Sequence, residues 1–433
     1  MKVVIIGAGL SGLSTALALR KYVRLPNEEA VEISIYDRAD PHDTGKYGFN
    51  DHADVRQKQQ GAAISLQPNA LRVLRDLDPE LADKVYTSGY PCTHFTWKTA
   101  GDILLGRDYL DLLPISRPIL VQCLAEALPE NVRIIYKTII KVEPRQGSSL
   151  KSIVHFEDGT QEEADLLVGA DGIRSPLRHC LFKDDTELAE SKYLGVCAVG
   201  GVLDMPLPKD YLDDPCIVFA IGANGTFGYC GLNRTEANKL LYFSFYDSEE
   251  MPDRTKVDYQ EITKHLRERH HDWADPLIHD CLSKADIDNV YPICYVPDLP
   301  HWGHSGCVLV GDAAHAMPPA SGQGGSQAFE DGQSLALLLA GFLEKHNTSE
   351  GIEEAIKAFY DLRHGRVDKM KADGLEMERQ PKRPWGWATT LMMYAGLSAM
   401  VQVKYLSSFI WKGDPVVDWD AKEEVRKYLA ARE

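Results

Sequence analysis

Three glycine-containing turns, far apart in the chain, hold the residues whose types and spacing point to chemistry. Near the start, Gly7, Gly9 and Gly12 form a G-x-G-x-x-G pattern after the apolar run Val3–Ile6. In this pattern the first glycine makes a tight turn, the second lets a pyrophosphate approach the backbone, and the third lets a helix pack on a strand. The N–H groups and the dipole at that helix start then hold the phosphate. Asp37 ends the next alternating run, where an acid accepts hydrogen bonds from a ribose.

A second turn, Gly311-Asp312, follows the apolar run Cys307–Val310 and continues as Ala-Ala-His-Ala-Met-Pro-Pro. Further glycines precede the next predicted helix, at Gly322, Gly324 and Gly325. A helix N-terminus directs partial positive charge at its neighbour, which suits a ring that becomes negative on reduction. We interpret His315, inside this turn, as a hydrogen-bonded structural histidine.

A third turn, Asp171-Gly172, follows the apolar strand Leu166–Val168. In isolation such a turn is an ordinary strand end. Two other segments accompany these turns. One is Gly61-Ala62-Ala63-Ile64, with Pro68-Asn69-Ala70 after it, and the other is Arg117 in the order Arg-x-x-Leu-x-x-x-Leu.

Together these motifs resemble those of the FAD-dependent aromatic-ring hydroxylases, the group A flavoprotein monooxygenases, in the branch with salicylate and urate hydroxylases. The resemblance covers roughly residues 1–345. It implies that Asp312 bonds the ribityl chain of FAD and that Pro318 lies beside the flavin ring, close to the reaction. The FAD-binding residues implied are Gly7, Gly9, Leu10, Ser11, Gly12, Asp37, Arg38, Gly61, Ala62, Ala63, Arg117, Asp171, Gly172, Asp312, Gly322, Gly324 and Gly325.

The elements that must position these residues form an α/β fold. The resemblance implies a Rossmann-like FAD-binding domain interleaved with a mostly antiparallel β-sheet substrate domain, followed by a helical C-terminal segment. We expect residues 1–80, 109–186 and 297–375 in the FAD-binding domain, 81–108 and 187–296 in the substrate domain, and 376–433 in the helical segment. The antiparallel part is expected from the alternating runs and Asn-Gly turns of residues 190–246.

The activity implied is that of an FAD-dependent monooxygenase. NADPH or NADH binds transiently and reduces the flavin, O2 forms a flavin C4a-hydroperoxide, and an electron-rich substrate is hydroxylated or epoxidised. Two alternatives stay open: a flavin dehydrogenase or reductase without oxygen transfer, and a non-enzymatic binding protein that keeps the FAD fold.

The substrate is expected to differ from small anionic acids. Where many members carry Trp-Arg-Gly, this chain reads Val199-Gly200-Gly201, so the arginine is missing. A bulkier aromatic or prenylated metabolite is our hypothesis. Tyr229 is the candidate substrate-contacting phenol, with core packing as its alternative. The helix start Gly325-Ser326-Gln327 departs from Gly-x-Asn-Gln, and Ser326 is expected to cap the helix instead.

The composition narrows the partners. A net charge of −17 over 433 residues disfavours nucleic acid. Nine cysteines without a C-x-x-C pair favour neither a disulfide framework nor a metal site, and with no apparent leader a cytoplasmic protein is expected. The oligomeric state stays open between monomer and homodimer. Residues 384–403 are uncharged. They are interpreted as a packed helix or dimer surface, with membrane contact through 384–411, or a span, as alternatives.

Overall fold

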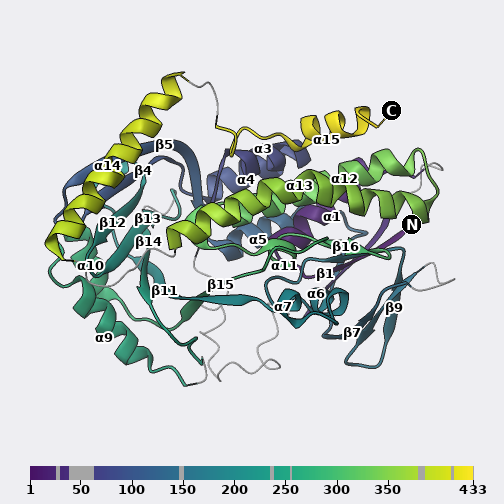
Figure 1. Ribbon diagram of the computed structural model, residues 1–433, viewed down its shortest axis with the longest axis horizontal. Helices are drawn as coiled ribbons and strands as arrows, with labels where there is room; N and C mark the ends of the chain where they lie inside the picture. The colour runs from purple at the N-terminus through teal and green to yellow at the C-terminus, as the bar shows by residue number, and fades with distance from the viewer. Residues whose placement is uncertain are drawn as a thin grey trace.

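The computed structural model describes residues 1–25, 30–38, 63–145, 151–234, 238–253, 256–378, 386–410 and 414–432. Gly61 and Ala62 lie outside these ranges. Two large sheets stand side by side, each with helices against it, and a small three-stranded sheet lies at the edge (Figure 1).

The first large sheet is mainly parallel and buried. Its strand order is β16-β17-β10-β1-β2-β6, and β1 pairs in parallel with both β2 and β10. The runs are apolar without alternation because helices and the small sheet cover both faces. The bounds are β1 (Lys2–Ile6), β2 (Glu32–Asp37), β6 (Arg133–Tyr136), β10 (Leu166–Gly169), β16 (Gly303–His304) and β17 (Cys307–Leu309).

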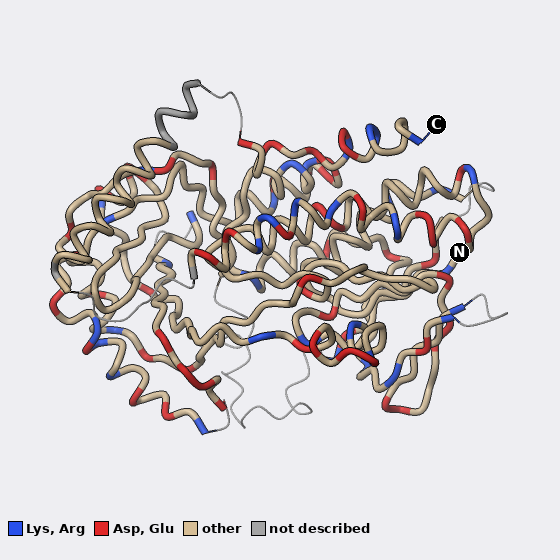
Figure 2. Tube along the Cα trace, viewed as in Figure 1, with Lys and Arg blue, Asp and Glu red and all other residues tan. Residues whose placement is uncertain are grey.

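Three helices pack together against this sheet: α1 (Leu10–Tyr22), α12 (Gly324–Leu343) and α13 (Thr348–Glu378). They lie on one side of it in Figure 1. Since α1 follows the first turn and α12 follows the last, this packing brings the two ends of the nucleotide-type fold together. Charges of both signs are spread along α13 in Figure 2, as expected for a partly solvated helix.

The second large sheet has the order β15-β11-β14-β13-β12-β4-β5-β3. All neighbours are antiparallel except β12 and β4. The bounds are β3 (Ile64–Leu66), β4 (Cys92–Thr99), β5 (Leu104–Ile115), β11 (Lys192–Asp204), β12 (Ile217–Gly222), β13 (Gly225–Gly231), β14 (Lys239–Asp247) and β15 (Val290–Tyr295). The expected interleaving of two sheets is confirmed. The larger sheet also takes β3 and the end of β5, which the predicted boundaries assign to the FAD-binding domain.

Burial alternates along the second sheet. On β14, Leu240, Tyr242 and Ser244 are buried while Leu241 and Phe243 are half-buried. The buried face forms a core with α9 (Tyr259–His270) and α10 (Pro276–Lys284). This is the pattern of a sheet with one covered face and one more open face.

The remaining elements connect these layers. They are β7 (Ile139–Glu143), β8 (Ser152–Phe156), β9 (Gln161–Ala164), α3 (Pro68–Leu77), α4 (Pro79–Ser88), α5 (Arg117–Glu126), α6 (Pro176–Leu181), α7 (Thr186–Ala189), α8 (Lys209–Asp213), α11 (Asp312–His315), the 3₁₀ turn η1 (Pro319–Ser321), α14 (Trp387–Ile410) and α15 (Ala421–Ala430).

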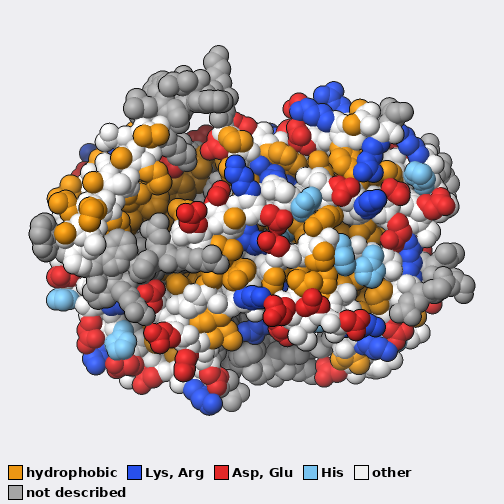
Figure 3. All heavy atoms as spheres, in the orientation of Figure 1, with side chains coloured by type: hydrophobic (Ala, Val, Ile, Leu, Met, Phe, Trp, Pro, Cys, Tyr) orange, Lys and Arg blue, Asp and Glu red, His pale blue; other side chains and the backbone are white. Residues whose placement is uncertain are grey.

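Residues 387–403 of the uncharged segment belong to α14, which packs along β5 on one side. A Cβ at Gly106 would lie 2.7 Å from Val401 Cγ1, and Tyr394 and Ser398 donate hydrogen bonds to backbone oxygens of the second sheet. This side of α14 is therefore packed, as expected, while a dimer surface and membrane contact stay predictions. The other side exposes Met392 and Met400, and Figure 3 shows hydrophobic side chains gathered over this helix. In the described ranges no helix is both long and apolar enough to cross a membrane.

Candidate functional site

In the glycine turn after β1, two glycines allow close backbone packing and one leaves open space. A Cβ at Gly7 would lie 2.3 Å from Ala170 O, and one at Gly12 would lie 1.9 Å from Gly7 O. A Cβ at Gly9 would meet no described heavy atom within 4 Å. The outer glycines therefore let backbone segments touch, whereas Gly9 leaves an open approach. The helix α1 begins at Leu10 without a side-chain cap, so its first N–H groups can bind an anion.

Asp37 lies beside this turn. Its Oδ2 accepts the N–H of Ala8 at 2.7 Å, while Gly7 N–H donates to Tyr36 O at 2.7 Å. The carboxylate thus fixes the glycine turn, a task that the sequence pattern does not reveal. Arg38, the next residue, is exposed.

The three predicted turns follow the carboxyl ends of three adjacent strands, β1, β10 and β17. Ligands of open α/β sheets bind at this edge. The turn after β17 touches the turn after β1, because a Cβ on Gly311 would lie 2.1 Å from Ser11 Oγ. Residues that are remote in sequence therefore line one continuous edge.

The turn after β10 carries a half-buried acid, Asp171. One oxygen of Asp171 accepts the N–H of Leu177 at 3.3 Å, and the other is buried without a partner among the described residues. Burial raises the pKa of this carboxyl to about 6, despite hydrogen bonds that favour the anion. Gly172 follows at φ +76°, and the space where its Cβ would stand is open.

Two charged groups are exposed at helix starts. Asp312 is the first residue of α11 and Arg117 the first of α5. Neither side chain has a hydrogen bond or ion pair within the described part of the chain. Among the residues that the structure describes, this carboxylate and this guanidinium are therefore available to a ligand.

The segment after α11 is built around glycines and prolines. Pro318 is buried and precedes η1, and Gly322 has φ +62°. The helix α12 begins at Gly324, earlier than expected, with Gln323 as its N-cap. Ser326 is therefore not the cap: it lies in the first turn, where its hydroxyl accepts the N–H of Gln67 at 3.4 Å.

Both edges of the larger sheet attach to this segment. Val296, just after β15, donates its N–H to Ala316 O at 2.9 Å. At the other edge, Gln67 follows β3 and donates to Gly322 O at 3.0 Å. The loop between Ala316 and Gly322 therefore stands where the two sheets meet.

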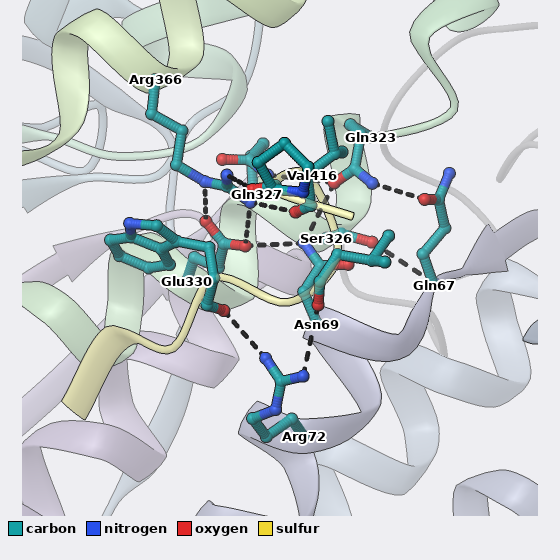
Figure 4. A network of polar contacts seen from close by, with 12 residues as sticks. Gln67, Asn69, Arg72, Gln323, Ser326, Gln327, Glu330, Arg366 and Val416 are labelled. Atoms are coloured by element: carbon teal, nitrogen blue, oxygen red, sulfur yellow. Dashed lines mark hydrogen bonds and ion pairs between the residues drawn. The ribbon is translucent and has the colours of Figure 1, made fainter. Parts of the chain in front are cut away.

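A buried polar network lies behind this loop (Figure 4). Glu330 accepts hydrogen bonds from Asn69 at 2.6 Å and from Arg366 at 2.9 Å. His315 is 2% exposed and bonds Asp331 at 2.6 Å, which confirms its structural role.

Sequence reasoning missed two buried arginines of this region. Arg178 donates to Ile173 O and, at 2.9 Å, to Ala313 O, so it ties the second turn to the third. Arg363 pairs with Glu330 and Asp331. The sequence position of Arg363 could have indicated its burial. It follows Phe359 by four residues and precedes Val367 by four, so it lies on an otherwise apolar helix face.

The placement of Tyr229 favours its packing alternative. The side chain is 3% exposed, lies on the helix-covered face, and donates to Asp275 Oδ2 at 2.7 Å. Burial beside that carboxylate raises its phenol pKa. The residue before it, Gly228, belongs to the opposite face because side chains alternate along a strand.

The described residues fit a dinucleotide that ends in a planar, reducible ring. The open glycine at position 9 and the N-terminus of α1 suit a diphosphate, and the exposed Asp312 suits hydroxyl groups. The N–H groups of Gly324 and Gly325 have no partners within α12, and the Cβ position of Gly324 is open. They suit a ring that gains negative charge.

Comparison with known proteins agrees with this fit. The profile of a family described as FAD binding domain matches residues 123–359. Salicylate hydroxylase of Pseudomonas putida is 26% identical over 397 residues, which are 87% of this chain and 84% of that protein. Chloroplastic zeaxanthin epoxidase of Nicotiana plumbaginifolia is 29% identical over 356 residues, 78% of this chain and 48% of that protein.

Among solved structures, HpxO of Klebsiella pneumoniae in complex with FAD and uric acid superposes with a TM-score of 0.72. It is 19% identical, and the match covers 93% of this chain and 95% of that one.

Proposed function

The chain belongs to the FAD binding domain family and is an FAD-dependent monooxygenase, and from this premise we propose how its residues divide the work. The overall reaction consumes the substrate, O2, NADPH or NADH, and a proton. It gives the hydroxylated or epoxidised product, water and the oxidised nicotinamide. Bound FAD supplies the redox chemistry and the activation of oxygen, and the protein supplies binding, orientation and exclusion of water.

In this proposal the three turns hold successive parts of FAD. The N-terminus of α1 binds the diphosphate, and Asp37 binds the adenosine ribose beside the glycine turn. Asp312 binds the ribityl chain, and this role is supported by its exposed carboxylate, which has no partner among the described residues. The glycine-rich start of α12 stabilises negative charge on the reduced ring.

The face of the larger sheet that points away from α9 and α10 carries the observation that supports our choice of substrate class. Trp97, Phe219 and Phe243, here called the aromatic row, stand on one line across β4, β12 and β14. Trp97 and Phe219 stack with ring centroids 4.9 Å apart, and Phe219 meets Phe243 edge to face at 5.5 Å. All three are only half-buried.

Glycines make room along the same line. Gly228 lies between Phe219 and Phe243 in the register, and a Cβ there would come within 2.3 Å of the Phe243 ring. Gly200 of β11 pairs with Phe243, and as a glycine it places no charge beside that ring. A continuous aromatic platform without an arginine suits a flat, neutral ligand.

We therefore propose that the substrate is a neutral, extended aromatic compound, such as a fused-ring, indolic or prenylated metabolite. The test measures how a panel of such compounds, and salicylate as the small anion, accelerates flavin reduction by NADPH in stopped flow. Mass spectrometry then detects the oxygenated product. Acceleration by neutral extended compounds supports the proposal, and acceleration by small carboxylates alone contradicts it.

A variant pair locates the binding face. We expect Phe243→Ala to raise the KM of an active substrate about 2- to 12-fold, the worth of one aromatic contact. Tyr229→Phe, on the covered face, is the matched control and leaves the KM unchanged. Equal KM changes in both variants would show that the sheet acts only through stability.

We also propose that the enzyme works in the cytoplasm as a monomer or homodimer. All nine cysteines are free thiols, which supports a reducing compartment. Light scattering on a size-exclusion column separates the two oligomeric states, and fractionation of the source cells tests the compartment.

A further inference from the structure

The network behind the loop between Ala316 and Gly322 contains a set of buried charges. Arg363, Glu330 and Asp331 are each at most 1% exposed. Arg363 Nε lies 3.0 Å from Asp331 Oδ1, and its Nη1 lies 2.5 Å from Glu330 Oε2. Arg366 bonds Glu330 at 2.9 Å, so two cations face two anions. Buried charges are tolerated only when their pairing is complete, so this geometry is tightly constrained.

One end of the network is the turn that carries Asp312. A single oxygen of Asp331, Oδ2, accepts the Gly311 N–H at 2.8 Å and bonds His315 Nε2 at 2.6 Å. These two residues flank Asp312 at the start and end of α11. The orientation of the Asp331 carboxylate therefore sets the position of the short helix. Arg363 holds the other oxygen and acts on the turn only through Asp331.

The opposite end is covered by the C-terminal segment 415–420, here called the clasp. The ring of Trp419 lies against both guanidinium groups, 4.7 Å from Arg363 and 4.9 Å from Arg366. Arg366 donates to Pro415 O at 2.9 Å and also to Val416 O. Arg72 donates to Trp419 O at 2.9 Å, and Figure 4 shows Arg72, Val416 and Arg366 around Glu330.

We propose that the clasp is a positioning device for FAD. By covering Arg363, Trp419 keeps the Arg363–Asp331 pair away from water, where its attraction is strongest. The pair in turn holds the Gly311–Asp312 turn in the geometry that binds the ribityl chain. The C-terminal tail thus sets the affinity of the enzyme for FAD without touching the cofactor. This inference rests on the proposed role of Asp312.

The experiment titrates apoprotein with FAD and follows the quenching of flavin fluorescence. The visible circular dichroism of the bound flavin and the melting temperature of the apoprotein are measured beside it. We expect Trp419→Ala to raise the Kd for FAD about 2- to 30-fold, the range of such indirect couplings, and to alter the flavin dichroism. Trp419→Phe keeps an aromatic face over the guanidinium groups and restores both readouts.

A matched control loosens the same tail without touching the clasp. Leu429 of α15 fills the space over Gly341, where a Cβ would lie 2.6 Å from Leu429 Cδ1. We expect Leu429→Ala to lower the melting temperature and leave the Kd for FAD unchanged. If Leu429→Ala weakens FAD binding as much as Trp419→Ala does, the clasp has no specific role and the proposal is wrong.

Two further variants complete the test. If Trp419→Ala does not fold, Arg72→Met removes the bonds that hold the clasp carbonyls, and it should raise the Kd in the same direction. An unchanged Kd in the folded variant overturns the clasp. Asp312→Ala separates this proposal from the one it rests on: an unchanged Kd there removes the ribityl assignment, whereas a weakened Kd there with normal binding in Trp419→Ala removes only the clasp.

Discussion

Gly311 approaches Ser11 so closely that a Cβ on Gly311 would lie 2.1 Å from the serine hydroxyl oxygen. Its backbone, at φ 58° and ψ −139°, lies close to a region that practically only glycine adopts. The turns after β1 and β17 are thus in van der Waals contact, and the contact exists because position 311 has no side chain.

Gly311→Ala should therefore lower both the free energy of unfolding and the affinity for FAD. Backbone strain alone costs about 1–3 kcal/mol of unfolding free energy, before the clash with Ser11 is counted. Urea denaturation and FAD titration measure the two losses. Gly365→Ala is the matched control, because position 365 is helical and its Cβ would meet no described atom within 4 Å. That variant should be slightly more stable, by about 0.5–1 kcal/mol. A stable, flavin-loaded Gly311→Ala protein would contradict the close contact.

Asp312 and Asp37 should respond differently to the same change. Asp312→Asn removes a charge that has no partner in the described structure, so apoprotein stability stays the same while FAD binding weakens about tenfold or more, as for a charged hydrogen bond of about 1.5–3 kcal/mol. Asp37→Asn also disturbs the bond to Ala8 N–H and should lower the melting temperature of the apoprotein. Calorimetry of both apoproteins, with and without FAD, makes the comparison, and equal losses of apoprotein stability would speak against it.

Tyr229→Phe should affect stability and spare catalysis. It deletes the hydroxyl that bonds Asp275, whose other oxygen caps α10 through the Leu277 N–H. A buried hydrogen bond to a charged group contributes about 1.5–3 kcal/mol. Chemical denaturation should show a loss of this order, with kcat and KM unchanged. A preserved stability with a changed KM would return Tyr229 to the substrate site.

Asp171 gives the protein a pH signature. Its pKa in the folded chain is about 6, above its ordinary value of 3.8, so the folded state binds more protons than the unfolded state between these values. The contribution of the Asp171 carboxyl to the free energy of unfolding is fully present below about pH 4 and is lost as pH rises towards 6. Asp171→Asn removes the penalty and should gain about 1–3 kcal/mol relative to the parent at pH 7. Unfolding free energies at pH 4.5 and 7 test this, and a gain that does not grow with pH would contradict it.

The sequence predicts well the three turns that meet at one edge of the first sheet, because each turn has a local cause. Gly7 and Gly311 have positive φ, and the apolar runs before them are long enough to be recognised as buried strands. Interleaving of two sheets also follows, since the alternating runs lie between segments without alternation. The prediction that Ser326 caps the helix was wrong, because α12 begins at the two glycines that precede Ser326.

Which face of a strand meets the substrate is a different problem. Tyr229 and Gly228 are neighbours in β13, and a shift of one residue exchanges the covered face for the open one. The residues of β13 alone do not determine which of its faces is covered. The helices α9 and α10, which come later in the chain, cover one face. The clasp was missed for a similar reason, because Trp419 meets Arg363 only in the folded chain.

The attachment of both sheet edges to the loop between Ala316 and Gly322 limits how this enzyme can be recombined. A chimera that exchanges residues 81–296 would replace most of the larger sheet but also β6 and β10 of the first sheet. It would leave β3 behind, although β3 pairs with β5. It would also change the segment whose Val296 N–H holds Ala316. Substrate preference is therefore better transferred in small steps along the aromatic row than as one exchanged module, because the residues at the module's borders hold the loop between Ala316 and Gly322.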